Sequence, residues 1–323
     1  MKETAYAYAV ARIRANEPSL LTAADIEQLV AVDGAQPVLR FLEDKGWIDP
    51  EKRESLDAVF RHQAEKAWRL LTEIAPDIGE LEFLIVRNDF HNIKAALKAY
   101  VADQEKTDAF IWPSLIDPEE IRTAIGNKQY ESLPGFAKAA IQKTYDILVR
   151  TLDGQLADII LDAMALNEMT AMAKRAGSPF AEELVELFCV AANIKIAFRA
   201  AKTGKDSAFL ETALCETRTL VKPDLVKTAS KGVEEFIQYL SHTVYREAAE
   251  QVKTSTTAFE KWCDDILMAH VLKAKYVSFG IDPLVAFFIA KEAEIKTVRM
   301  ILSCKYHAIP TETIRERVRK IYA

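Results

Sequence analysis

One sequence pattern occurs three times along the chain, and this repetition constrains the fold more than any other feature. The copies read FLIVRNDFHNIKAALKA, LVELFCVAANIKIAFRA and VAFFIAKEAEIKTVRMI. They align without gaps and place Ile93, Ile194 and Ile295 at equal spacings of 101 residues, each followed by a lysine. Because similar units in tandem pack against their neighbours, the chain is expected to form a helical array or a closed bundle of three units.

Each copy contains one long amphipathic helix, which we call a stripe helix because its apolar residues recur at spacings of three and four. Two short helices are expected upstream of it, within residues 21–47, 116–141 and 221–243, with breaks at Gly34, Gly126 and residues 230–232. Another long helix is expected between the short pair and the stripe helix, within residues 50–75, 155–176 and 259–277.

Capping residues and polar stretches predict where these units begin and end. Asp77, Ser178 and Asp282 are expected to cap the three stripe helices. Short polar stretches at Lys106–Thr107 and Thr203–Ser207 mark the unit boundaries. With only 10 glycines and 11 prolines in 323 residues, the chain has few turn formers. We therefore predict an all-α fold of three helical subdomains, residues 1–104, 105–208 and 209–323.

Composition and charge argue against several classes of protein. The formal net charge of −6 disfavours a nucleic-acid-binding protein. No apolar run reaches the roughly 18 residues of a membrane-spanning helix, and the first residues lack the apolar core of a secretory signal. Four cysteines in a chain of this length do not indicate a disulfide framework, so a reducing cytoplasm is expected.

Motifs that carry chemistry are weak. The sequence has no glycine-rich phosphate loop and no zinc-protease or di-iron spacing. Asp264–Asp265 is similar to the first aspartates of a prenyl-diphosphate site, but no second acidic cluster accompanies it. Cys304 and His307 have a ligand-like spacing without a second pair. We therefore predict no catalytic residue, no metal ligand and no cofactor.

The third stripe helix carries charges where its sister helices are apolar. Glu292 and Arg299 stand at such positions, and Glu294 occupies the place of an asparagine in the other two copies. An unpaired buried charge costs several kcal/mol, so these groups either pair internally or face a partner. We expect Glu292 and Arg299 to be satisfied internally and Glu294 or Lys296 to face a partner. The candidate partner-binding residues are Glu292, Glu294, Lys296 and Arg299.

Four segments resemble the C subunit of the archaeal and bacterial V-type ATPases, whose eukaryotic equivalent is the d subunit. They are RNDFHNIKAAL (87–97), IDPEEIRTAIGNKQYESLPGFAKAA (116–140), FGIDPLVAFFIAKEAEIKTVRMIL (279–302) and IPTETIRER (309–317). The resemblance implies three subdomains related by a pseudo-threefold axis and forming a funnel. It also implies a non-catalytic socket, peripheral on the cytoplasmic side of the membrane. This socket would join the central shaft, made of the D and F subunits, to the proteolipid ring, whose coupling ion is a proton or sodium.

Two other functions remain open on the residues alone. The first is a free-standing helical-repeat scaffold that binds other protein partners. The second is an all-helical enzyme acting on diphosphates, which the missing second acidic cluster disfavours.

Overall fold

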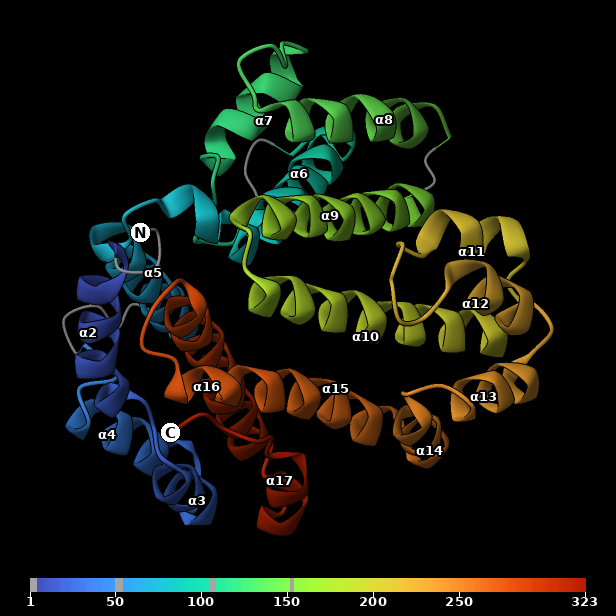
Figure 1. Cartoon of the computed structure of the whole chain (residues 1–323). Coiled ribbons are helices and arrows are strands. Elements are labelled where there is room, and N and C mark those ends of the chain that lie inside the picture. Colours follow the sequence, from blue (N-terminus) through green and yellow to red (C-terminus); the bar gives the residue numbers. More distant parts are fainter. Residues whose placement is uncertain (1–4, 50–54, 105–108, 152–153) are drawn as a thin grey trace. The chain divides into compact units, whose positions relative to one another are not determined.

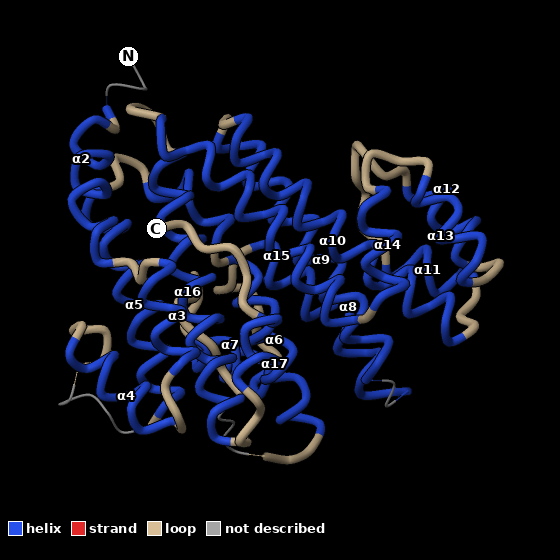
Figure 2. Tube along the Cα trace, turned by 90° about the horizontal axis from the view of Figure 1, so that it is seen from below, coloured by secondary structure: helices blue, strands red, loops and turns tan. Residues whose placement is uncertain are grey.

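The computed structural model describes residues 5–49, 55–104, 109–151 and 154–323. Over these ranges every regular element is a helix (Figures 1 and 2), which confirms the all-α prediction. The α-helices are α2 (Ala7–Asn16), α3 (Ala23–Ala31), α4 (Ala35–Asp44), α5 (Leu56–Ile74), α6 (Val86–Val101), α7 (Pro118–Asn127), α8 (Gly135–Thr151), α9 (Gly154–Ala176), α10 (Pro179–Thr203), α11 (Ser207–Ala213), α12 (Lys222–Ala229), α13 (Val233–Ser241), α14 (Arg246–Thr254), α15 (Thr256–Val271), α16 (Asp282–Tyr306) and α17 (Thr311–Arg317). Short 3-10 helices are η1 (Glu17–Ser19), η3 (Ile78–Leu84) and η4 (Leu272–Tyr276).

The helices gather into two compact units. One combines both ends of the chain, Met1–Ile78 and Gln251–Ala323, and the other is Gly79–Glu250. The predicted boundary at Lys106–Thr107 lies outside the described residues, whereas Thr203–Ser207 falls between α10 and α11. The three-subdomain division of the chain stays a prediction.

Each stripe helix packs against helices of the following copy. In Gly79–Glu250, α6 lies against α7, α8 and α9, and α10 lies against α11, α12 and α13. In the unit that contains both termini, α16 lies against α2, α4 and α5. The last stripe helix therefore packs against the first copy as well as against α15 and η4 of its own copy. This packing against the first copy explains why the two ends of the chain form one unit.

Burial of the stripe helices follows the predicted period. Ile93 and Ile194 are fully buried, and Ile295 is 9% exposed. Ile295 belongs to a core cluster with Leu29 of α3 and Val38 of α4. Removing apolar surface of this kind from water contributes about 25 cal/mol per Å² and holds the helices together.

The predicted helix starts are correct at one position and wrong at two. Ser178 caps α10, and its hydroxyl accepts the Ala181 N–H at 3.1 Å. Asp77 does not cap α6, because a 3-10 helix intervenes and the α-helix begins only at Val86. Asp282 is the first residue of α16 rather than its N-cap, because Ile281 before it has already taken helical backbone angles and occupies the capping position.

One predicted helix break is also misplaced. Gly126 lies inside α7, which continues to Asn127. The helix ends at the next residue, Lys128, whose backbone is left-handed with φ 56°. The breaks at Gly34 and Gly232 agree with the sequence. Each glycine directly precedes a helix, and their φ angles are positive, 77° and 137° respectively.

Candidate partner-binding site on the third stripe helix

The four predicted site residues of α16 lie in different environments. Glu294 is buried at 5% exposure, and Glu292 is half-buried. Lys296 and Arg299 are exposed, with more than half of each side chain open to solvent. The sequence places all four on one short stretch, but the helix turns them toward the core, toward α15 and toward α5, as their contacts show below.

Glu294 anchors the first copy to the last stripe helix. Its carboxylate accepts the Leu21 N–H at 2.5 Å and the Trp47 indole N–H at 2.6 Å. The Lys291 ammonium donates to the same carboxylate. The Glu294 carboxylate thus makes all of these hydrogen bonds inside the protein. Glu294 and Lys296 were the two residues expected to face a partner, and of these only Lys296 is exposed.

Lys291 is a site residue that the sequence analysis missed. It is 8% exposed and lies over the Trp47 ring, with 5.3 Å between the ammonium nitrogen and the ring centroid. Burial lowers the pKa of Lys291, while the Glu294 carboxylate works in the opposite direction. The sequence could have predicted this pair, because residues three positions apart on a helix are neighbours and Lys291 and Glu294 carry opposite charges.

The first two stripe helices hold the following segment in an equivalent way. The Asn92 amide donates to the Ile111 carbonyl at 3.0 Å and accepts the Ile111 N–H at 2.9 Å. The Asn193 amide does the same with Cys215, at 2.8 and 3.1 Å. An amide can serve both a carbonyl and an N–H, whereas a carboxylate only accepts. Glu294 fits the asparagine position because its partners there are donors.

Carboxylates reinforce the same attachment in the first two copies. Asp89 of α6 accepts the Ile116 N–H at 2.8 Å, and Glu186 of α10 accepts the Thr219 N–H at 2.8 Å. The bound main-chain groups lie at similar places. Ile116 directly precedes the N-cap of α7, and Leu21 directly precedes the N-cap of α3. Thr219 lies two residues before the N-cap of α12. Every stripe helix therefore binds the main chain just upstream of the next short helix pair.

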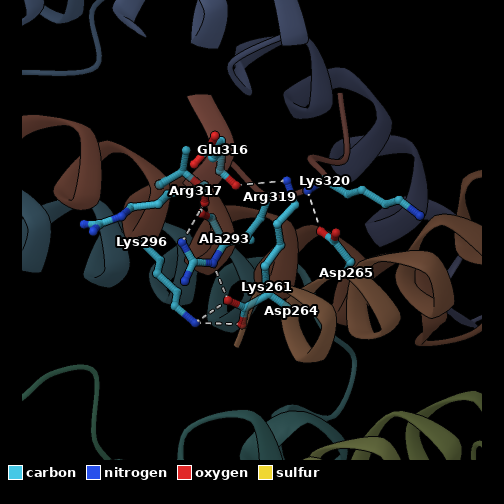
Figure 3. A network of polar contacts seen from close by, with 10 residues as sticks. Lys261, Asp264, Asp265, Ala293, Lys296, Glu316, Arg317, Arg319 and Lys320 are labelled. Atoms are coloured by element: carbon cyan, nitrogen blue, oxygen red, sulfur yellow. Dashed lines mark hydrogen bonds and ion pairs between the residues drawn. The ribbon is translucent and has the colours of Figure 1, made fainter. Parts of the chain in front are cut away.

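Lys296 belongs to a charged network that joins α15, α16 and the C-terminal segment (Figure 3). Its ammonium contacts the Asp264 carboxylate at 2.6 Å. Arg319 contacts the same carboxylate at 2.5 Å, and Asp265 accepts the Lys320 N–H at 2.7 Å. The Asp264–Asp265 pair thus anchors the end of the chain. Within the part of the chain that the structure describes, no cluster of metal-ligating side chains is found.

Arg299 faces α5 of the first copy. Its guanidinium lies 4.6 Å from the centroid of the Phe60 ring and 3.6 Å from the Asp57 carboxylate. Both charged partners are exposed, so their attraction is screened and contributes at most about 1 kcal/mol. Arg299 therefore finds its contacts on α5, within the same unit.

Comparison with known proteins identifies the family. Residues 9–317 match the family described as ATP synthase (C/AC39) subunit. The chain belongs to this family. Its members are non-catalytic accessory subunits of V-type ATPase complexes.

Relatives of the C/AC39 family match nearly the full chain at modest identity. The C subunit of the V-type sodium ATPase of Enterococcus hirae is 25% identical over 317 residues, covering 96% of this chain and 97% of the relative. The C subunit of the A-type ATP synthase of Methanocaldococcus jannaschii is 26% identical, covering 96% and 85%. The C subunit of the V-type ATP synthase of Thermus thermophilus is 22% identical, covering 97% and 98%.

None of the helices that the structure describes is both long and apolar enough to cross a membrane. The long apolar stretch of α10, for example, carries Lys195 and Arg199.

Proposed function

We propose that this protein is the non-catalytic socket of a V-type ATPase or ATP synthase rotor. In this role it joins the central shaft, made of the D and F subunits, to the proteolipid ring on the cytoplasmic side of the membrane. Its three helical subdomains surround a pseudo-threefold axis and form a funnel. Rotation passes through it between the ATP-handling head and the ring that carries protons or sodium ions.

The observation that carries the proposal is the repeated attachment of each stripe helix to the next copy. A coupling protein has to transmit torque without local unfolding, which favours buried anchors over exposed loops. Glu186 and Glu294 supply such anchors as charged carboxylates that accept main-chain N–H groups. The Asp89 carboxyl accepts the Ile116 N–H at the equivalent place, although burial disfavours its charged form. Hydrogen bonds to a charged group contribute roughly 1.5–3 kcal/mol each. Closure of the third copy onto the first supports a cyclic arrangement of the three subdomains.

Lys296 is the residue of the candidate site that we propose for contact with the shaft. Its side chain is 56% exposed, although its ammonium touches Asp264. Because Arg319 also neutralises the Asp264 carboxylate, Lys296 can exchange that carboxylate for one on a partner at little cost. Charges at the edge of an interface steer association more than they stabilise the fold.

Recovery of complexes from solubilised membranes tests the role. The tagged protein is expected to co-purify with shaft and proteolipid subunits. Lys296→Glu is expected to weaken assembly with a purified shaft about two- to fivefold at low salt, in keeping with an exposed charge. Lys231→Glu, an exposed lysine in the other unit, serves as the control. The melting temperature of the isolated variant is expected to change by less than about 2 °C.

One result would contradict this role, and another would contradict the proposed contact between Lys296 and the shaft. Co-purification with unrelated proteins and without shaft or ring subunits would favour a free-standing scaffold. A Lys296→Glu variant that melts much earlier yet binds the shaft normally would assign Lys296 to the fold instead.

A further inference from the structure

A cavity opens beside the Lys291–Glu294 pair in the unit that contains both termini. Its volume is about 380 Å³, and it is bordered by α5, α16 and the loops before α3 and after α4. Ligand pockets in proteins usually measure about 300–1,000 Å³, so this space suits a small molecule. Its apolar wall includes Leu20, Trp47, Leu70 and Phe287.

Basic side chains dominate the charged lining. Lys45, Lys66, Arg69 and Lys291 face the cavity, against the acidic Asp25 and Glu73. Lys45 and Asp25 neutralise each other, with 2.8 Å between their charged atoms. Lys66 and Arg69 lie three positions apart, on one side of α5. Glu294 balances Lys291, and Glu73 opposes one of the two remaining cations, so Lys66 and Arg69 leave one positive charge in excess although the whole chain is acidic.

Lys291 has hydrogen-bonding capacity left over. An ammonium has three donors. Among the residues that the structure describes, the only hydrogen-bond partner of Lys291 is Glu294. Since the lysine side chain is only 10% exposed, its remaining donors depend on what occupies the cavity. Nearby Lys66 also lowers the pKa of Lys291, so an anion here relieves repulsion between the two cations.

We propose that this cavity binds a small organic anion, a phosphate or carboxylate group carried on a compact apolar body. Lys66, Arg69 and Lys291 hold the anionic group, and the apolar body lies against Trp47 and Phe287. The proposal goes beyond the coupling role and does not depend on it, because it concerns the protein in isolation. Occupancy would also stiffen the attachment of α16 to the first copy, since Lys291 and Trp47 contact both the ligand and Glu294.

Calorimetric titration of the full chain with defined probes tests the proposal. Phenyl phosphate and benzoate carry both features, inorganic phosphate carries only the charge, and benzyl alcohol carries only the ring. We expect saturable one-to-one binding of at least one aromatic anion and weaker binding of inorganic phosphate and benzyl alcohol. Lys66→Ala with Arg69→Ala should weaken that binding about tenfold or more, the effect of losing a charge-assisted hydrogen bond.

The control variant is Lys231→Ala, which removes an exposed lysine in the other unit and should leave binding unchanged. Neither α5 substitution is at a buried position, so the double variant is expected to fold, and its circular dichroism should match that of the wild type. No saturable heat with either aromatic anion would overturn the proposal. Equal binding by the double variant, or binding of benzyl alcohol as tightly as phenyl phosphate, would do so as well.

Discussion

Glu294 accepts hydrogen bonds from the loop before α3, from the loop after α4 and from Lys291 on its own helix, and this buried lysine balances its charge. Glu294→Gln keeps the size of the side chain but leaves the Lys291 ammonium without its counter-charge. Breaking a buried pair in this way costs several kcal/mol, and we expect a loss of about 2–4 kcal/mol in the free energy of unfolding. Urea denaturation measures the loss, with the exposed Glu316→Gln as control. A loss no larger than that of the control would show that the anchor is unimportant.

Asp89 gives the protein a pH dependence of its own. Burial raises the pKa of this carboxyl from the ordinary 3.8 to about 7, although the N–H groups of Leu115 and Ile116 act against the shift. The folded state therefore binds more protons than the unfolded state between those pH values. The contribution of Asp89 to stability is fully present below about pH 4 and is lost as the pH rises through 7.

Asp89→Asn removes this titration, because asparagine imitates the protonated acid. We expect the variant to be more stable than the wild type at pH 8 by about 2–4 kcal/mol, and the difference to shrink toward pH 4. Urea denaturation at several pH values measures it, with the exposed Asp224→Asn as control. An unchanged pH profile would mean that the Asp89 carboxyl titrates normally in the folded protein.

At the scale of elements, α10 positions α11 and α12 through one amide. Asn193 is fully buried and satisfies both the N–H and the carbonyl of Cys215 in the segment between those helices. Asn193→Ala leaves both main-chain groups unpaired in the core. We expect a loss of about 2–4 kcal/mol, since an unsatisfied buried polar group costs roughly 1–3 kcal/mol. Hydrogen exchange should accelerate most in residues 207–229.

Asn193→Asp refines the same experiment, because it keeps the acceptor for the Cys215 N–H and loses the donor to the carbonyl. If hydrogen exchange in Asn193→Asp is as fast as in Asn193→Ala, the hydrogen bond donated to the Cys215 carbonyl contributes most of the stabilisation. Uniform acceleration over all helices of residues 79–250 in either variant would contradict a local anchoring role for Asn193.

At the scale of the whole molecule, the first and last parts of the chain should unfold together. The core cluster of their unit includes Ile26 of α3 and Ile301 of α16, which are 275 residues apart. Ile26→Ala is expected to cost about 2–5 kcal/mol and to accelerate hydrogen exchange in α16 as well as α3. The matched control is Ile121→Ala in α7, which should affect α6 and leave α16 unchanged. If hydrogen exchange in the Ile26→Ala variant were accelerated only in α3, this cooperativity would be contradicted.

Helix content, the repeat and the buried isoleucines were determined by the sequence alone. Periodicity is local: apolar residues three and four apart define the buried face of a helix wherever that helix is finally placed. Ile93, Ile194 and Ile295 are buried for this reason. The tandem repeat and four segments of the sequence also indicated the family, because both can be recognised from the order of the residues along the chain.

Which charges of α16 are internal depends on contacts between segments that are distant in the sequence. From the sequence, Glu294 was a residue that could face a partner, whereas it is buried and binds Leu21 and Trp47, which lie more than 240 residues away in sequence. A polar side chain is satisfied by whatever donors folding brings to it, and the sequence around Glu294 does not contain them. The pairing of α16 with the first copy, which supplies those donors, follows from packing between distant segments and not from any local pattern.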